Sequence, residues 1–162
     1  MSRFEIEIRE PLRHLSLLAL SGRCIAAVAD TLQEALDGEL AKQPRGLLVD
    51  GSRLEELEGP CLIEILQADR QLRARHGGLA LFALPAVVMS SLKQADLLDE
   101  VAVHRDFAAA RQALEAHIRN ARTAAAAGAA LEGVASPRRR RRRRLDRRQG
   151  QALVAAAAQI LG

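Results

Sequence analysis

Dense apolar runs of strand length alternate with amphipathic helical patterns over the first 118 residues, and this alternation constrains the fold more than any other feature. The runs occupy residues 15–20, 46–49 and 79–84. Such runs are typical of strands that are buried on both faces of a sheet. Strands that alternate with helices favour right-handed crossovers, so the sequence predicts an α/β fold with a largely parallel sheet.

The first strand has a different pattern. Residues 4–9 alternate apolar with charged side chains, as in a half-buried strand, and Glu10 and Pro11 indicate a turn after it. We expect this strand at the rim of the sheet, antiparallel to its neighbour. With a brief strand at 101–103, the predicted order is β-β-α-β-α-β-α-β-α. This order describes a mixed, mostly parallel sheet of four to five strands with about four helices.

Helix ends carry their own signals. The second helix is expected to begin at Cys61 and to end at Gly77 and Gly78, because glycine adopts the left-handed conformation of a helix C-cap. Asp106 is expected to cap the last helix. The stretch from Asp50 to Leu62 is expected to form the loop and the helix start at the strand-to-helix corner, where α/β domains usually keep their functional groups.

The composition indicates one globular domain with an aliphatic core. Hydrophobic residues make up 49% of the 162 residues, yet the chain has three Phe and no Trp or Tyr. No run approaches the ~20 apolar residues of a membrane span, and no secretory signal is recognisable, so we expect a cytoplasmic protein. Cys24 and Cys61 are expected to be reduced thiols, and no zinc-ligand spacing is present. We expect no cofactor and no metal.

Charge separates the body of the chain from its C-terminal part. Residues 138–148 carry +8 of a chain whose net charge is +4, so the remainder is mildly acidic. We expect a domain at 1–122, an Ala/Gly-rich linker at 123–137, a poly-Arg segment at 138–148 and a short apolar helix or docking peptide at 149–162. The poly-Arg segment is expected to be disordered when unbound, because its like charges repel.

Several short motifs, in this order and spacing, together resemble the STAS domain. They are Leu-Ala-Leu-Ser-Gly at 18–22, Leu-Val-Asp at 48–50, the stretch from Leu72 through Gly77 to Leu81, and His-Arg-Asp at 104–106. The STAS domain is the fold of anti-sigma-factor antagonists and of the cytosolic domains of sulfate transporters. The resemblance covers about residues 4–118.

In that family the corner usually reads Asp-Ser-Ser-Gly or Asp-Ser-Thr-Gly, and the second hydroxyl is phosphorylated to switch partner binding. The resemblance places Glu58, Gly59, Pro60 and Cys61 at these four positions. No Ser or Thr occurs from Arg53 through Leu62. A phosphate at a helix start would meet free backbone N–H groups, but proline offers no acceptor hydroxyl for it.

The resemblance therefore implies a non-catalytic interaction module whose docking does not depend on phosphorylation. Its expected partner is a regulatory or scaffold protein, of which an anti-sigma-kinase-like protein is one candidate. The candidate docking residues are Glu55, Glu56, Glu58, Gly59, Pro60, Cys61 and Leu62. The three glutamates predict an acidic loop. Cys61 is either a small packed residue where the family has glycine or a thiol with a lowered pKa at a helix start.

The arginines give an alternative function. They could neutralise phosphates of nucleic acid, another polyanion or an anionic surface, and the body would then serve recruitment or homo-oligomerisation. No aromatic residues interleave to stack on bases, so such binding would not read sequence. The simpler interpretation is that the arginine-rich tail only keeps the protein in solution. The candidate polyanion-binding residues are Arg138, Arg139, Arg140, Arg141, Arg142, Arg143, Arg144, Arg147 and Arg148.

Overall fold

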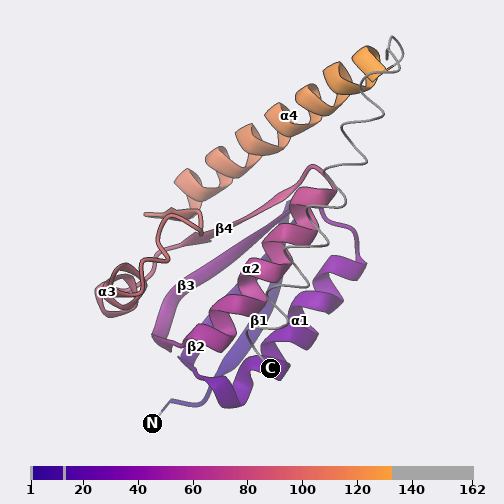
Figure 1. Cartoon of the computed structure of the whole chain (residues 1–162). Coiled ribbons are helices and arrows are strands. Elements are labelled where there is room, and N and C mark those ends of the chain that lie inside the picture. The colour runs from indigo at the N-terminus through magenta and orange to yellow at the C-terminus, as the bar shows by residue number, and fades with distance from the viewer. Residues whose placement is uncertain (1, 13, 133–162) are drawn as a thin grey trace, which may run out of the picture. The chain divides into compact units, whose positions relative to one another are not determined.

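The computed structural model describes residues 2–12 and 14–132 of the chain (Figure 1). The chain divides into two compact units, 1–123 and 124–162. The predictions for residues 133–162, the poly-Arg segment and the apolar C-terminal peptide among them, lie outside the described residues.

The described residues form one five-stranded sheet with the strands in sequence order. The strands are β1 (Glu5–Leu12), β2 (Leu15–Cys24), β3 (Gly46–Leu57), β4 (Gly78–Phe82) and β5 (Val103–His104). β1 is antiparallel to β2, and every later pair is parallel. The predicted α/β class, the mostly parallel sheet and the antiparallel strand at the rim are confirmed.

Helices cover both faces of this sheet. A short 3-10 turn, η1 (Ala26–Val28), precedes α1 (Ala29–Ala41), and the other helices are α2 (Gly59–Ala74), α3 (Ala86–Gln94) and α4 (Phe107–Glu132). α1 and α2 lie side by side over one face (Figure 1), where their leucines pack against Leu18, Leu47 and Leu81. α4 packs on the other face through Ala110, Leu114 and Ile118.

The core is aliphatic, as the composition predicted. Its largest fully buried side chains are mostly leucines, with Ile65, Val49 and Val88 among them. The smaller cluster under α4 adds one aromatic contact, in which the rings of Phe82 and Phe107 meet edge to face with centroids 5.7 Å apart.

The expected loop between Val49 and Cys61 is wrong in its extent. β3 does not end at Val49 but continues to Leu57, because Leu54 and Leu57 alternate into the core and Leu57 pairs with Cys24 of β2. α2 begins at Gly59, two residues before the predicted Cys61. Glu58 is therefore the one residue between β3 and α2.

Other predicted boundaries shift by a few residues. β1 passes through Glu10 and Pro11 to Leu12, after a register irregularity beyond Arg9. The left-handed residue after α2 is His76, with φ +63°, whereas Gly78 already belongs to β4. Asp106 caps α4 as expected, accepting a 2.8 Å hydrogen bond from the N–H of Ala109.

The expected linker at 123–137 is helical as far as Glu132, because its alanines continue α4 without a break. The domain boundaries themselves remain a prediction.

Gly22 is the position where the fold most directly requires glycine. It lies at a register irregularity of β2 with φ +82°, and a Cβ there would overlap the carbonyl oxygen of Arg3. We expect Gly22→Ala to lower the free energy of unfolding by at least about 1–2 kcal/mol, the usual cost of a left-handed L-residue. Denaturant titration measures the change.

Gly38 provides the matched control. It lies inside α1, is exposed, and a Cβ there would meet nothing within 4 Å. Gly38→Ala should raise the free energy of unfolding by about 0.5–1 kcal/mol, since alanine loses less backbone entropy in a helix. If both variants changed the free energy of unfolding in the same direction, the requirement for glycine at position 22 would be contradicted.

Candidate functional site

The candidate site is the corner where β2, β3 and β4 end and the following helices begin. These strands are parallel neighbours, so their carboxyl ends point to the same side of the sheet. Only β2 and β3 end level with each other, at Cys24 and Leu57, whereas β4 ends at Phe82, which pairs with Asp50 of β3. η1, α2 and α3 start there, at Ala26, Gly59 and Ala86. Ligands and partners of α/β sheets commonly bind at this edge.

Glu58 holds the corner together. Its backbone N–H donates a 2.9 Å hydrogen bond to the carbonyl of Cys24. Its side-chain Oε2 accepts a 2.7 Å hydrogen bond from the N–H of Ala26, the first residue of η1. The carboxylate therefore satisfies a backbone donor at a helix start, as a capping residue does, although it comes from a distant part of the chain.

The other two glutamates differ from each other. Glu56 is partly buried and forms an ion pair with Arg23, at 2.6 Å between Oε2 and Nη2. Glu55 is exposed and has no ion pair within residues 2–12 and 14–132. Of the three acidic side chains predicted to line a solvated loop, two thus have partners inside the domain and one faces solvent on β3.

Cys61 and Leu62 lie beneath the surface. Cys61 is 0% exposed and Leu62 is 2% exposed. The Cys61 thiol donates a hydrogen bond to the carbonyl of Ile25, with a sulfur–oxygen distance of 3.2 Å. Neither side chain is accessible to a partner unless the corner opens.

Burial also determines the chemistry of the two cysteines, which are free thiols that contact each other. Burial raises the pKa of the Cys24 thiol, and the contact with Cys61 raises it further. Burial also raises the pKa of Cys61, against the opposing effect of its hydrogen bond with Cys24. A raised thiol pKa suppresses the thiolate, so these findings favour the interpretation of Cys61 as a packed residue over that of a nucleophile.

Gly59 and Pro60 are exposed, and the structure adds two residues that the sequence analysis did not select. Ile63 on α2 is 52% exposed and Val87 on α3 is 69% exposed. Both lie in the first turn or so of a helix that starts at this edge of the sheet. A helical wheel would have flagged Ile63, which falls off the buried stripe formed by Leu62, Ile65 and Leu72.

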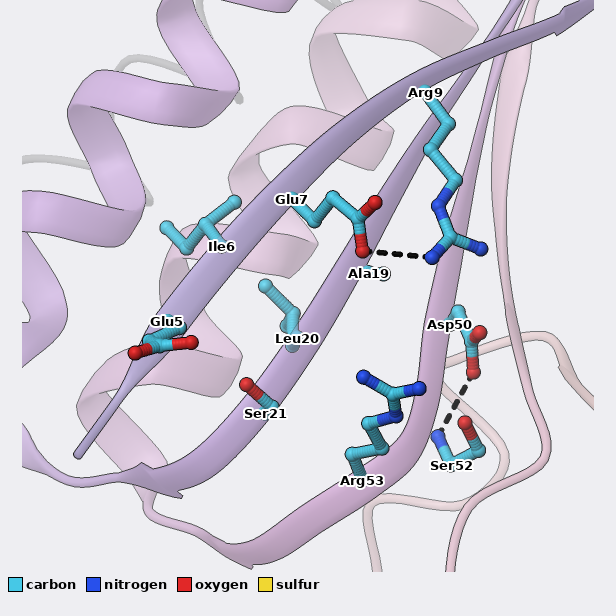
Figure 2. Close-up of a pocket in the computed structure, with 10 residues that line it drawn as sticks. All are labelled: Glu5, Ile6, Glu7, Arg9, Ala19, Leu20, Ser21, Asp50, Ser52 and Arg53. Atoms are coloured by element: carbon cyan, nitrogen blue, oxygen red, sulfur yellow. Dashed lines mark hydrogen bonds and ion pairs between the residues drawn. The ribbon is translucent and has the colours of Figure 1, made fainter. Parts of the chain in front are cut away.

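A separate polar hollow of about 280 Å³ lies over β1, β2 and β3. In Figure 2, Arg9 and Arg53 point toward it from β1 and β3. Glu7 accepts a 2.7 Å hydrogen bond from Arg9, and Asp50 accepts a 2.9 Å hydrogen bond from the N–H of Ser52. Side chains of both charges line this hollow, which is distinct from the corner.

The described residues contain no group of three or more His, Cys, Asp or Glu placed to hold a metal ion. Among the described helices, none is long and apolar enough to cross a bilayer. The nine candidate arginines between 138 and 148 lie beyond Glu132 and have no structural description.

A family model described as "Mlab, STAS domain" matches residues 12–103, more than half of the chain. The chain belongs to the STAS family. STAS domains are typically non-catalytic regulatory modules. The match runs from the last residue of β1 to the first residue of β5 and includes the whole corner. No curated protein matches the sequence.

The fold of this chain is similar to the solved structures of anti-sigma factor antagonists. One from Mycobacterium paratuberculosis has a TM-score of 0.61 at 18% identity, covering 70% of this chain and 95% of that one. A putative one from Thermotoga maritima has a TM-score of 0.60 at 17% identity, covering 69% and 94%. The unphosphorylated form of the Bacillus antagonist SpoIIAA has a TM-score of 0.55 at 13% identity, covering 63% and 90%. At these identities the likeness shows the fold alone.

The buried thiols of this STAS domain predict a loss of stability at alkaline pH. A thiol with a raised folded pKa stabilises the protein fully below its unfolded pKa, about 8.5, and the contribution is lost as pH rises above that value. We expect the free energy of unfolding to fall by up to about 1.4 kcal/mol per pH unit for each thiol, measured by urea titration. The chain has no Tyr, and its lysines are Lys42 and Lys93, so few other groups titrate in the same pH range.

The variant Cys24→Ala/Cys61→Ala is the control for this effect. Its free energy of unfolding should be lower at neutral pH because of the cavities it creates, but it should change little between about pH 8 and 10. Parallel pH profiles for the two proteins would show that the thiols do not cause the slope.

Proposed function

We propose that this STAS domain is a non-catalytic interaction module that docks a regulatory or scaffold protein through its corner. We define the corner surface as the exposed side chains of Glu55, Gly59, Pro60, Ile63 and Val87. The observation that carries the proposal is the exposure of Ile63 and Val87 at the edge of the sheet where the helices begin. Exposed apolar side chains that together form one patch favour association with another protein.

The similarity to anti-sigma factor antagonists supports a regulatory protein as the partner. SpoIIAA has been solved in a phosphorylated and an unphosphorylated form, so that protein exists in two states. In this chain Pro60 stands where the family has its phosphorylated hydroxyl, and no Ser or Thr lies between Arg53 and Leu62. We infer that the corner surface binds its partner without a phosphorylation switch.

The chemistry of the corner surface indicates what the partner presents. Glu56 and Glu58 are engaged by Arg23 and by the N–H of Ala26, which leaves Glu55 as the exposed acid. The surface is therefore mainly apolar, with one carboxylate at its side. A complementary partner presents an apolar side chain to Ile63 and Val87 and a basic or polar group toward Glu55.

A charge introduced at Ile63 tests the corner surface. We expect Ile63→Glu to weaken partner binding by about 30-fold or more, because burying an unpaired carboxylate at the centre of an interface costs about 2 kcal/mol or more. Affinity purification of wild type and variant from the native cytosol, followed by mass spectrometry and a binding titration with the captured protein, measures the effect. A phosphorylated Ser or Thr anywhere in the purified wild-type domain that lowers partner binding would overturn the absence of a phosphorylation switch.

Gln71→Glu is the matched control. It adds the same charge to an exposed position of the same helix, but two turns further on, about 12 Å along the axis. It should capture the same partner as the wild type. A partner that binds wild type, Ile63→Glu and Gln71→Glu equally well would place docking elsewhere on the domain.

A second candidate function rests on the arginine run, since nine arginines within residues 138–148 suit a non-specific polyanion tether. Replacing Arg138 to Arg144 by glutamine in the full chain should flatten the salt dependence of binding to random-sequence duplex DNA. The slope of log K against log salt is about −0.9 per neutralised phosphate, so losing seven cations should reduce it by up to about 6. An unchanged slope would exclude the run as the DNA-binding element.

A further inference from the structure

β1 is the open edge of the sheet. Within the described residues it hydrogen-bonds to a strand on one side only, namely β2. The strand at the other edge, β5, has two residues, whereas β1 has eight. An edge strand presents a row of backbone N–H and C=O groups with which another strand can pair. β1 is therefore the edge at which a strand can be added.

An exposed apolar side chain lies in the middle of this edge strand. Ile6 packs against the core under α1 and α2, and Ile8 lies two residues further along β1, on the same face. Ile8 is nevertheless 49% exposed. Ile8 thus continues the apolar face of β1 beyond the part that the domain itself covers, and a neighbouring strand would shield it from water.

The opposite face of β1 carries charges of both signs. Glu5, Glu7 and Arg9 line the polar hollow there (Figure 2). Glu7 and Arg9 are 57% and 49% exposed and form a 2.7 Å ion pair within the strand. The hydrogen bond from Arg9 lowers the pKa of Glu7, so the carboxylate is charged at neutral pH. The charged face is available for pairing with charges on an added strand.

The order of these charges selects one way of pairing two identical strands. An antiparallel pair about a two-fold axis at Ile6 would put Glu5 opposite Glu7 of the other copy. An axis at Glu7 would put Glu5 opposite Arg9 twice, but it would also put Glu7 opposite itself. An axis at Ile8 puts Glu7 opposite Arg9 twice and Ile8 opposite Ile8, with no like-charge pair; the next pairs are Ile6 with Glu10 and Glu5 with Pro11, beyond the register irregularity of β1. Opposite charges across a strand pair stabilise it, whereas like charges destabilise it.

We propose that β1 is a dimerisation edge: two copies of this chain pair their β1 strands antiparallel about a two-fold axis at Ile8 and form one continuous sheet. A second copy suits this edge because the charge pattern is self-complementary when the strand direction is reversed. The pairing covers the two Ile8 side chains and adds two Glu7–Arg9 ion pairs between the copies. It leaves the corner surface free and does not rest on the proposed function.

Cysteine cross-linking tests the register directly. Directly opposed residues of antiparallel strands have Cα atoms about 4.5–5.5 Å apart, within the range of a disulfide, so Ile8→Cys should cross-link to itself under mild oxidation. The native Cys24 and Cys61 are 0% exposed and should not compete. Ile63→Cys is the matched control, because Ile63 is exposed to a similar degree, 52%, but lies on α2.

We expect the Ile8→Cys chain to run as a covalent dimer of twice 17.6 kDa on non-reducing gels, and the Ile63→Cys chain to stay monomeric. Equal cross-linking of the two variants, or none at position 8, would overturn the proposal. Sedimentation of the nuclease-treated wild-type chain over a concentration series should show a monomer–dimer equilibrium. A monomer at every concentration would likewise overturn it.

A charge-reversal experiment separates pairing from a general effect on folding. In Glu7→Arg two arginines face each other across the seam, and in Arg9→Glu two glutamates do, so each variant alone should dimerise roughly tenfold more weakly than the wild type. Mixing the two variants restores opposite charges at both positions. The mixture should form heterodimers of wild-type affinity, whereas failure to recover on mixing would refute the register.

Discussion

The pairing of β2 with β3 along their whole common length is the constraint on which the corner depends. Because Cys24 pairs with Leu57, the two strands end together, and Glu58 alone connects β3 to α2. So short a connection fixes the direction in which α2 leaves the sheet and brings the Cys61 thiol against the carbonyl of Ile25. The corner is thus held by contacts between β2, β3 and α2, and it contains no long loop that could rearrange independently.

The order and direction of the strands could be predicted because burial on both faces leaves dense apolar runs in the sequence. The length of β3 could not, because Asp50, Gly51 and Ser52 favour a turn locally, while pairing with β2 overrides that preference. The partners of Glu56 and Glu58 lie 33 and 32 residues away along the chain. Sequence patterns that span only neighbouring residues therefore predict that both side chains are solvated. They overestimate the number of exposed carboxylates at the corner.

The proposed corner surface would differ from one that is switched by a phosphate. A hydroxyl at a helix start can gain or lose a double negative charge, whereas Pro60, Ile63 and Val87 present a constant apolar surface. Apolar contacts respond little to salt or to a kinase, so binding through them would be governed by the concentrations of the two proteins. The sequence alone suggested the missing acceptor, but the exposure of Ile63 and Val87 became visible only when the helices were placed on the sheet.

The two proposed interfaces are compatible because they use different parts of the same sheet. The corner surface lies at the carboxyl ends of β3 and β4, whereas the dimer seam is centred on Ile8, which pairs with Leu18 in the middle of β2. Antiparallel pairing of two β1 strands reverses the direction of one sheet relative to the other. The two corner surfaces of such a dimer would then lie at opposite ends of the continuous sheet. A dimer of this kind would bridge two separate partners, because no single small partner could reach both corners at once.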